Sequence, residues 1–267
     1  MIKAVIGLML FGIAGVAQAD DLRDLCADRP GKGSPACTVD AGHLQAEIGL
    51  ADWSHDRNRD SIVDGLSLGD IAMRYGLGSS TELRLDWTAY GHVRTRDRTT
   101  GAVRRDNGSG DVTIGLRQNL HNPDGSGFAV ALQPFATLPT GGHAIGAGTW
   151  SAGLIVPVSY QLPSNIQFGL TGEIDAAPDE DRHGRHTAYS AAASVSVPVT
   201  KSITGSAELW AMRDRDPAGH SSQLSVDLAA AWVPKDKGRL QLDAGAYVGL
   251  NRQTPDIETY LGVTEKF

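Results

Sequence analysis

The sequence predicts an all-β protein, an antiparallel transmembrane β-barrel of about 12 strands with both chain termini on the periplasmic side. Three observations lead to this prediction. The chain begins with an export signal, and its polar and apolar residues alternate along most of its length. No segment after the signal has the roughly 20 apolar residues that a transmembrane helix needs.

The first 19 residues have the organisation of a cleaved signal peptide. Lys3 provides a positive charge, residues 4–16 are apolar and uncharged, and Ala17-Gln18-Ala19 supplies the small residues that precede a cleavage site. The apolar stretch is too short to span a bilayer as a helix. We therefore expect cleavage after Ala19 and export to the outer membrane of a Gram-negative bacterium.

Beyond Gly42 the sequence repeats with a period of two residues, which is typical of strands with one polar and one apolar face. Residues 82–90 and 111–120 show this alternation clearly. Each predicted strand is long enough to cross an outer membrane obliquely. The expected strands lie at 43–53, 66–77, 81–95, 110–120, 128–139, 150–162, 166–176, 187–199, 203–213, 222–233, 239–251 and 256–267.

The connections between these strands alternate in length. Tight turns rich in Gly, Pro, Ser and Asn are expected at 78–80, 163–165 and 200–202. Longer polar loops are expected at 96–109 and 178–186. Short turns at one end and long loops at the other are typical of outer-membrane barrels. In a soluble β-sandwich, which is the alternative, short and long connections are not expected to alternate in this way.

Aromatic residues on the apolar face gather near the predicted short turns, and a sparser group lies toward the long loops. Rings at these levels are typical of the girdles that mark the two membrane interfaces. The alternative is that they fill a soluble core. The expected periplasmic girdle consists of Tyr75, Phe128, Tyr160, Phe168, Trp232 and Phe267, and the sparser group of Trp53, Trp87, Trp150 and Tyr189.

The chain ends in an aromatic residue on an alternating strand, in which Leu261, Val263 and Phe267 follow the apolar face. A terminal aromatic of this kind is the signal that barrel-assembly machinery recognises, so we expect this machinery and outer-membrane lipid as partners. Glu265 interrupts the pattern, but a charge near the membrane interface costs little.

Both cysteines, Cys26 and Cys37, precede the first predicted strand. In an oxidising periplasm such a pair is expected to form a disulfide. The cross-link restricts the unfolded chain and thereby raises its free energy by about 3 kcal/mol. Two free thiols are the alternative. The predicted organisation is a signal peptide at 1–19, a periplasmic N-terminal segment at 20–41 and a transmembrane barrel at 42–267.

Several short motifs are spread over nearly the whole mature chain, at 27–30, 38–47, 74–77, 82–84, 110–116, 138–141 and 255–267. In these the chain resembles the family named for the putative MetA pathway of phenol degradation, whose members are described as transporters. The resemblance implies an outer-membrane barrel that transports small molecules, with aromatic or other poorly soluble compounds among the candidates. The paired cysteines and Glu265 look like departures from the family pattern.

If the apolar faces meet lipid, the opposite faces line the lumen, where charges must be paired or hydrated. One interpretation is a structural network that fills the interior. The other is a constriction in which Arg74, Arg84 and Arg117 face carboxylates and select solutes by charge. Barrels of eight strands are filled and barrels of sixteen are open, so the interior of a twelve-stranded barrel decides whether it conducts. The expected lumen residues are Arg74, Glu82, Arg84, Asp86, Arg117, Glu173, Glu208, Asp227 and Asp243, together with Glu47, Gln133 and Tyr247.

Composition excludes nucleic acid as a partner, because the chain has no basic run and a net charge of −7. No metal or cofactor is expected. His183 and His186, beside Asp179, Glu180 and Asp181, could bind a metal ion, but the segment is interpreted as a solvated loop.

A lipid-modifying enzyme would need a serine, a histidine and a carboxylate or amide within reach of one another. His92 near a strand end, with Ser109 and Ser151 as neighbours, is the candidate set, and no motif marks either serine.

We therefore expect a channel through which small-molecule solutes pass by diffusion, without a cofactor or an energy source. One alternative is a closed structural barrel that acts through its extracellular loops. The other is the membrane-embedded enzyme. Conductance distinguishes a pore from a closed barrel.

Overall fold

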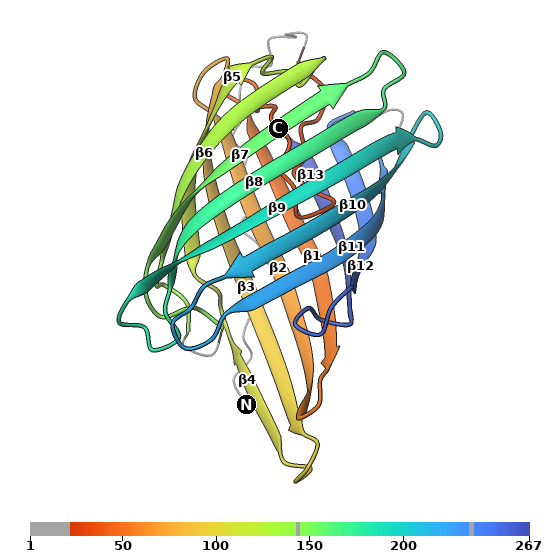
Figure 1. Cartoon of the computed structure of the whole chain (residues 1–267). Coiled ribbons are helices and arrows are strands. Elements are labelled where there is room, and N and C mark those ends of the chain that lie inside the picture. The colour runs from red at the N-terminus through yellow and green to blue at the C-terminus, as the bar shows by residue number, and fades with distance from the viewer. Residues whose placement is uncertain (1–21, 143–144, 235–237) are drawn as a thin grey trace, which may run out of the picture.

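The chain forms a closed antiparallel β-barrel in the computed structural model, which describes residues 22–142, 145–234 and 238–267 (Figure 1). The expected signal peptide lies outside these residues. Among the described residues, no helix is long and apolar enough to cross a bilayer. The strands are β1 (Leu44–Arg57), β2 (Ser61–Gly76), β3 (Thr81–Asp97), β4 (Val103–Gly108), β5 (Val112–His121), β6 (Phe128–Leu138), β7 (Ser151–Gln161), β8 (Gln167–Pro178), β9 (Arg185–Pro198), β10 (Ile203–Asp214), β11 (Ser221–Trp232), β12 (Leu240–Gly249) and β13 (Ile257–Lys266).

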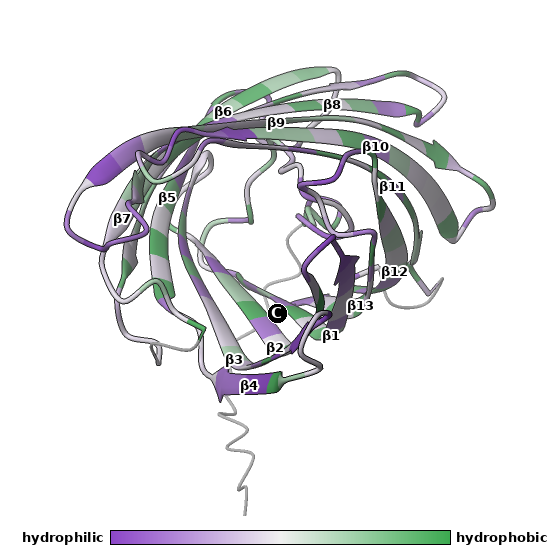
Figure 2. Cartoon of the chain, turned by 60° about the horizontal axis from the view of Figure 1, so that its bottom comes forward, coloured by the Kyte–Doolittle hydropathy of each residue, from purple (hydrophilic) through white to green (hydrophobic). Residues whose placement is uncertain are grey.

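The sheet closes on itself, because β1 pairs with β13 as well as with β2. Figure 2 shows the resulting ring, with β1 beside β13. β3 pairs with β5 along its first half and with β4 along its second half, so β4 and β5 share one position in the ring. The barrel therefore has twelve strand positions, and the predicted antiparallel barrel of about 12 strands is confirmed. The periplasmic location of both termini stays a prediction.

One predicted loop is wrong, because the connection expected at 96–109 contains β4. This strand pairs with the end of β3 in a hairpin that extends beyond the other strands, at the bottom of Figure 1. β1 and β2 also continue past their predicted ends, to Arg57 and back to Ser61. β4 has the sequence VRRDNG and is mostly exposed, so it carries no alternation for a sequence pattern to detect.

The distribution of residues is inverted relative to a soluble protein. Arg74, Glu82 and Arg117 are fully buried, whereas Leu85, Leu209 and Leu228 are exposed. In the described part of the chain the buried apolar cluster consists of three alanines alone, Ala36, Ala129 and Ala131. The apolar faces of the strands therefore point outward, as in a barrel that faces lipid, and the polar faces point into the lumen.

The six residues of the expected periplasmic girdle all lie on the outer surface, with 42–56% of each exposed. Phe128, Tyr160 and Phe168 are direct neighbours across β6, β7 and β8, and they form a row on the outside. Phe267 follows β13 and pairs with Leu44 at the start of β1, so it lies at the same end of the barrel. Their role as a membrane girdle remains a prediction.

Candidate functional site

Residues 22–41, which we call the plug, lie inside the barrel. Their polar contacts reach β2 at Arg74, β5 at Arg117, β8 at Thr171, β10 at Glu208 and β12 at Asp243. These strands lie on different sides of the ring, so a segment that touches all of them occupies the interior. The sequence placed this segment before the barrel and gave no reason to expect it in the lumen.

A disulfide between Cys26 and Cys37 closes a loop within the plug, as predicted. The barrel wall binds this loop at its backbone. The Gln45 side chain donates a hydrogen bond to the Cys26 carbonyl at 2.6 Å, and the Asn119 side chain donates to the Ala36 carbonyl at 2.8 Å. The cross-linked loop is therefore fixed between β1 and β5.

Asp28 in the plug lies among three arginines of the wall. Arg117 donates to its two carboxylate oxygens at 3.0 Å. Arg74 donates to it at 3.2 Å, and Arg84 forms an ion pair with it. All three arginines predicted to form a constriction are brought together here, and they bind the chain's own N-terminal segment.

Two wall carboxylates complete this cluster. Arg74 donates to Glu82 at 2.8 Å and to Glu47 at 3.0 Å. Both glutamates also accept from the plug backbone, Glu47 from the Asp28 N–H at 3.1 Å and Glu82 from the Val39 N–H at 2.8 Å. Each of the three arginines is thus paired with at least one carboxylate, which a largely buried cluster requires because an unpaired charge there costs about 3–5 kcal/mol.

A glycine-rich turn of the plug, residues 31–34, lies against the opposite wall. The backbone N–H groups of Lys32 and Gly33 donate to the two oxygens of Glu208 at 2.8 and 3.0 Å. A Cβ atom at Gly33 would lie 2.8 Å from Glu208 Oε2, so only glycine lets the backbone approach this carboxylate. The next residue of the turn donates its N–H to Thr171 Oγ1 at 2.9 Å.

The side chain of Lys32 in this turn and that of Arg29, just before it, reach β10 and β12. Arg29 forms an ion pair with Asp243 at 3.0 Å. The Lys32 ammonium lies 4.3 Å from the centre of the Tyr247 ring and 4.6 Å from that of Trp210, within the range of a cation–π contact. The plug is therefore attached around the lumen, with arginines of the wall on one side and carboxylates and aromatics on the other.

Two cavities lie beside the plug, which contributes Asp28, Arg29 and Gly33 to both. One, of about 400 Å³, extends along the inner face of β7 to β12. The other, of about 250 Å³, lies against β1 to β3. Six of the barrel residues that line the larger cavity carry hydroxyl groups, namely Ser159, Thr171, Ser194, Ser196, Thr204 and Ser206.

The other predicted lumen residues also lie on the inner wall, and Asp86 and Gln133 contact arginines of the cluster. Asp86 pairs with Arg84 at 2.8 Å, and Asp227 accepts the Tyr260 hydroxyl at 2.8 Å. Glu173 lies farther along β8, and within the described ranges no hydrogen bond joins it to the plug. Gln133, also on the inner wall, accepts from Arg117 at 2.8 Å.

The enzyme candidate set is not joined by hydrogen bonds among the described residues. His92 lies within β3 opposite Asn107, and among the described residues it has no hydrogen bond to Ser109 or to Ser151.

The profile of the family described as "Putative MetA-pathway of phenol degradation" matches residues 27–267. The chain belongs to this family. The resemblance drawn from the short sequence motifs is thus confirmed, and the match begins inside the plug, so the family pattern includes the segment that fills the lumen. No curated protein sequence matches the chain.

Solved structures of outer-membrane proteins share its fold. An outer membrane channel from Pseudomonas putida F1 superposes with a TM-score of 0.71 at 15% identity, over 89% of this chain and 99% of that one. The NanC porin gives a TM-score of 0.50 at 10% identity, over 84% of this chain and 100% of that one. The β domain of the Bordetella autotransporter BrkA gives 0.51 at 13% identity, over 85% and 99%. At these identities the likeness concerns the fold alone.

Proposed function

We propose that the chain is an outer-membrane channel that passes small polar solutes, and cations in preference to anions, along the inner face of β7 to β12. The observation that carries this proposal is the cavity of about 400 Å³ between the plug and that wall. The outer membrane channel and the porin that share the fold, and the outward-facing apolar surface of the barrel, support a channel role.

The charges along this wall favour cations. Glu208 accepts from backbone N–H groups, and Asp227 accepts from a tyrosine hydroxyl. These donors carry no net charge, so they do not cancel the negative charge of the two carboxylates. The wall arginines Arg74 and Arg117, by contrast, are paired with carboxylates on the other side of the lumen, and Arg29 of the plug is paired with Asp243. A pore lined by uncompensated carboxylates attracts cations and repels anions.

The lining also bears on the class of solute. The sequence resemblance implied aromatic or other poorly soluble compounds, but the hydroxyl groups of the larger cavity suit solutes that form hydrogen bonds. We therefore propose small polar molecules and organic cations, rather than hydrophobic compounds, as the solutes.

Ion selectivity in a planar bilayer tests the proposal. Under a salt gradient, we expect the refolded mature chain to give a reversal potential on the cation-selective side. Asp227→Asn should reduce this preference, because it removes a lumen charge and keeps the shape of the side chain. Asp106→Asn, on the exposed hairpin of β3 and β4, is the control and should leave the potential unchanged. Anion preference in the unmodified channel would overturn the proposal.

A closed structural barrel that acts through its extracellular loops is the second candidate, and the plug is the observation that favours it. A folded barrel that shows no current and admits no solute into liposomes would favour this candidate over the channel.

A further inference from the structure

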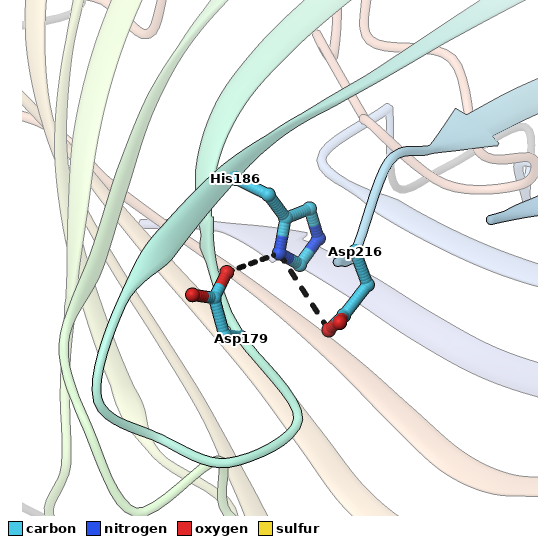
Figure 3. Close-up of side chains that lie close together, drawn as sticks. All are labelled: Asp179, His186 and Asp216. Carbon is cyan, nitrogen blue, oxygen red and sulfur yellow. Dashed lines mark hydrogen bonds and ion pairs between the residues drawn. The ribbon is translucent and has the colours of Figure 1, made fainter. Parts of the chain in front are cut away.

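A histidine and two aspartates converge at the end of the barrel that carries the predicted extracellular loops. Asp179 follows β8, His186 lies near the start of β9, and Asp216 lies in the connection after β10 (Figure 3). One ligand atom from each residue lies within 4.8 Å of the others. Residues from two separate connections are therefore brought to one point, and neither connection alone could form this group.

The distances between these atoms suit a small metal ion with tetrahedral coordination. His186 Nδ1 lies 2.9 Å from Asp179 Oδ1 and 3.6 Å from Asp216 Oδ2. Zinc binds histidine nitrogen and carboxylate oxygen at about 2.0–2.2 Å, which separates two ligand atoms of a tetrahedron by about 3.3 Å. The two distances from His186 Nδ1 lie on either side of that value, so each would change by only a few tenths of an ångström when an ion binds.

The His186 imidazole is buried and fixed in position rather than free in a solvated loop. Its side chain is 6% exposed, and its Nε2 has no hydrogen-bond partner in the described part of the chain. Nε2 nevertheless lies 3.0 Å from Asp214 Oδ1. A metal-binding histidine commonly donates its second N–H to a carboxylate, which fixes the ring and its tautomer. With Nδ1 on a metal ion, the Nε2 proton would be directed toward Asp214.

Both aspartates are also positioned by the two connections. The backbone N–H groups of Glu180, from the connection between β8 and β9, and of Ala218, from the connection of Asp216 itself, donate to Asp216, each at 2.7 Å. A Cβ atom at residue 184 would lie 2.0 Å from Asp179 Oδ2, so Gly184 leaves the space that the carboxylate occupies. The ligand atoms are thus placed before any ion is bound.

We infer that Asp179, His186 and Asp216 form a binding site for one divalent transition-metal ion of the zinc type, with water in the fourth position and Asp214 supporting the histidine. Carboxylate and imidazole ligands together suit zinc better than calcium or magnesium, which take oxygen ligands. A bound ion joins the connection between β8 and β9 to the one between β10 and β11, and it fixes both at the rim of the lumen.

The site is tested by titration of Zn²⁺ into the mature, tag-free chain, refolded in detergent and stripped of metal with a chelator. We expect calorimetry to show one saturable site per chain. Asp214→Asn should weaken binding by roughly 10–100-fold, the usual effect of losing a carboxylate that supports a ligand. His186→Ala and Asp216→Asn should weaken it further.

His183→Ala is the matched control, since His183 lies in the same connection but is 88% exposed and outside the group. This variant should bind Zn²⁺ as the unmodified chain does, and heat-modifiable gel mobility shows that each variant is folded. Zn²⁺ should also slow proteolysis within residues 179–184 and 215–220. Absence of a saturable site, or equal weakening by His183→Ala and His186→Ala, would show that the residues form an ion-pair network only.

Discussion

At the scale of single residues, Asp28 of the plug is the residue that contacts all three wall arginines. A period of two residues fixes the facing of every second side chain, so Arg74, Arg84 and Arg117 could be placed inside from the pattern alone. Their partner, Asp28, lies in a segment without alternation, and its position depends on how that segment folds back into the barrel. Long-range contacts of this kind leave no periodic signal.

Asp28→Asn tests whether this contact holds the plug. The change keeps the side-chain shape but removes the one negative charge that pairs with all three arginines. We expect the plug to lose about 3–5 kcal/mol of its binding to the barrel, and limited proteolysis within residues 22–41 to become faster. Asp106→Asn removes an exposed ion pair with Arg104 and should cost less than about 1 kcal/mol. Equal protease resistance in the Asp28 variant and the unmodified chain would show that the ion pairs do not hold the plug.

At the scale of elements, strands that face lipid on one side and the lumen on the other were predictable, and those that face water on both sides were not. β10 was expected at 203–213 and is found at Ile203–Asp214. β4 was missed, because its residues have no apolar face. The plug was missed for a related reason, since it is held by hydrogen bonds and ion pairs rather than by an apolar stripe.

A matched pair of substitutions in β10 tests the assigned facing. Leu209 is 49% exposed on the outer surface, whereas Ser206 lines the larger cavity. Leu209→Arg places a charge toward lipid and should destabilise the barrel by roughly 2–4 kcal/mol, measured as a lower unfolding midpoint in urea. Ser206→Arg places the same charge in a polar cavity and should fold nearly as well while reducing conductance. The reverse order of stabilities would contradict the inside-outside assignment.

At the scale of the whole molecule, the lumen has two unlike halves. The inner face of β1 to β5 supplies arginines and glutamates that bind the plug. The inner face of β7 to β12 supplies hydroxyl groups and carboxylates around the larger cavity. A twelve-stranded barrel is wide enough to conduct only if its interior is left open. In the channel that we propose, solutes follow the larger of the two cavities beside the plug, and the carboxylates of that side determine the selectivity.

The outer surface of the molecule indicates which end of the barrel faces the periplasm. The girdle residues, Phe267 among them, lie at the end of the barrel where β1 begins and where Gln45 contacts the plug. We propose that this end is periplasmic and that the C-terminal strand is recognised by the barrel-assembly machinery. In that case Phe267→Ala should reduce insertion into outer membranes without altering detergent refolding.

Single-channel conductance of the mature chain, compared with a chain that lacks residues 22–41, tests the central claim most directly. Without the plug, the wall charges become hydrated rather than unpaired, so the barrel should still fold and show heat-modifiable mobility. We expect a small, cation-selective conductance from the mature chain and a conductance several-fold larger from the shortened one. Equal conductances, from two chains shown to be folded, would contradict the account in which the N-terminal segment limits the passage of solutes.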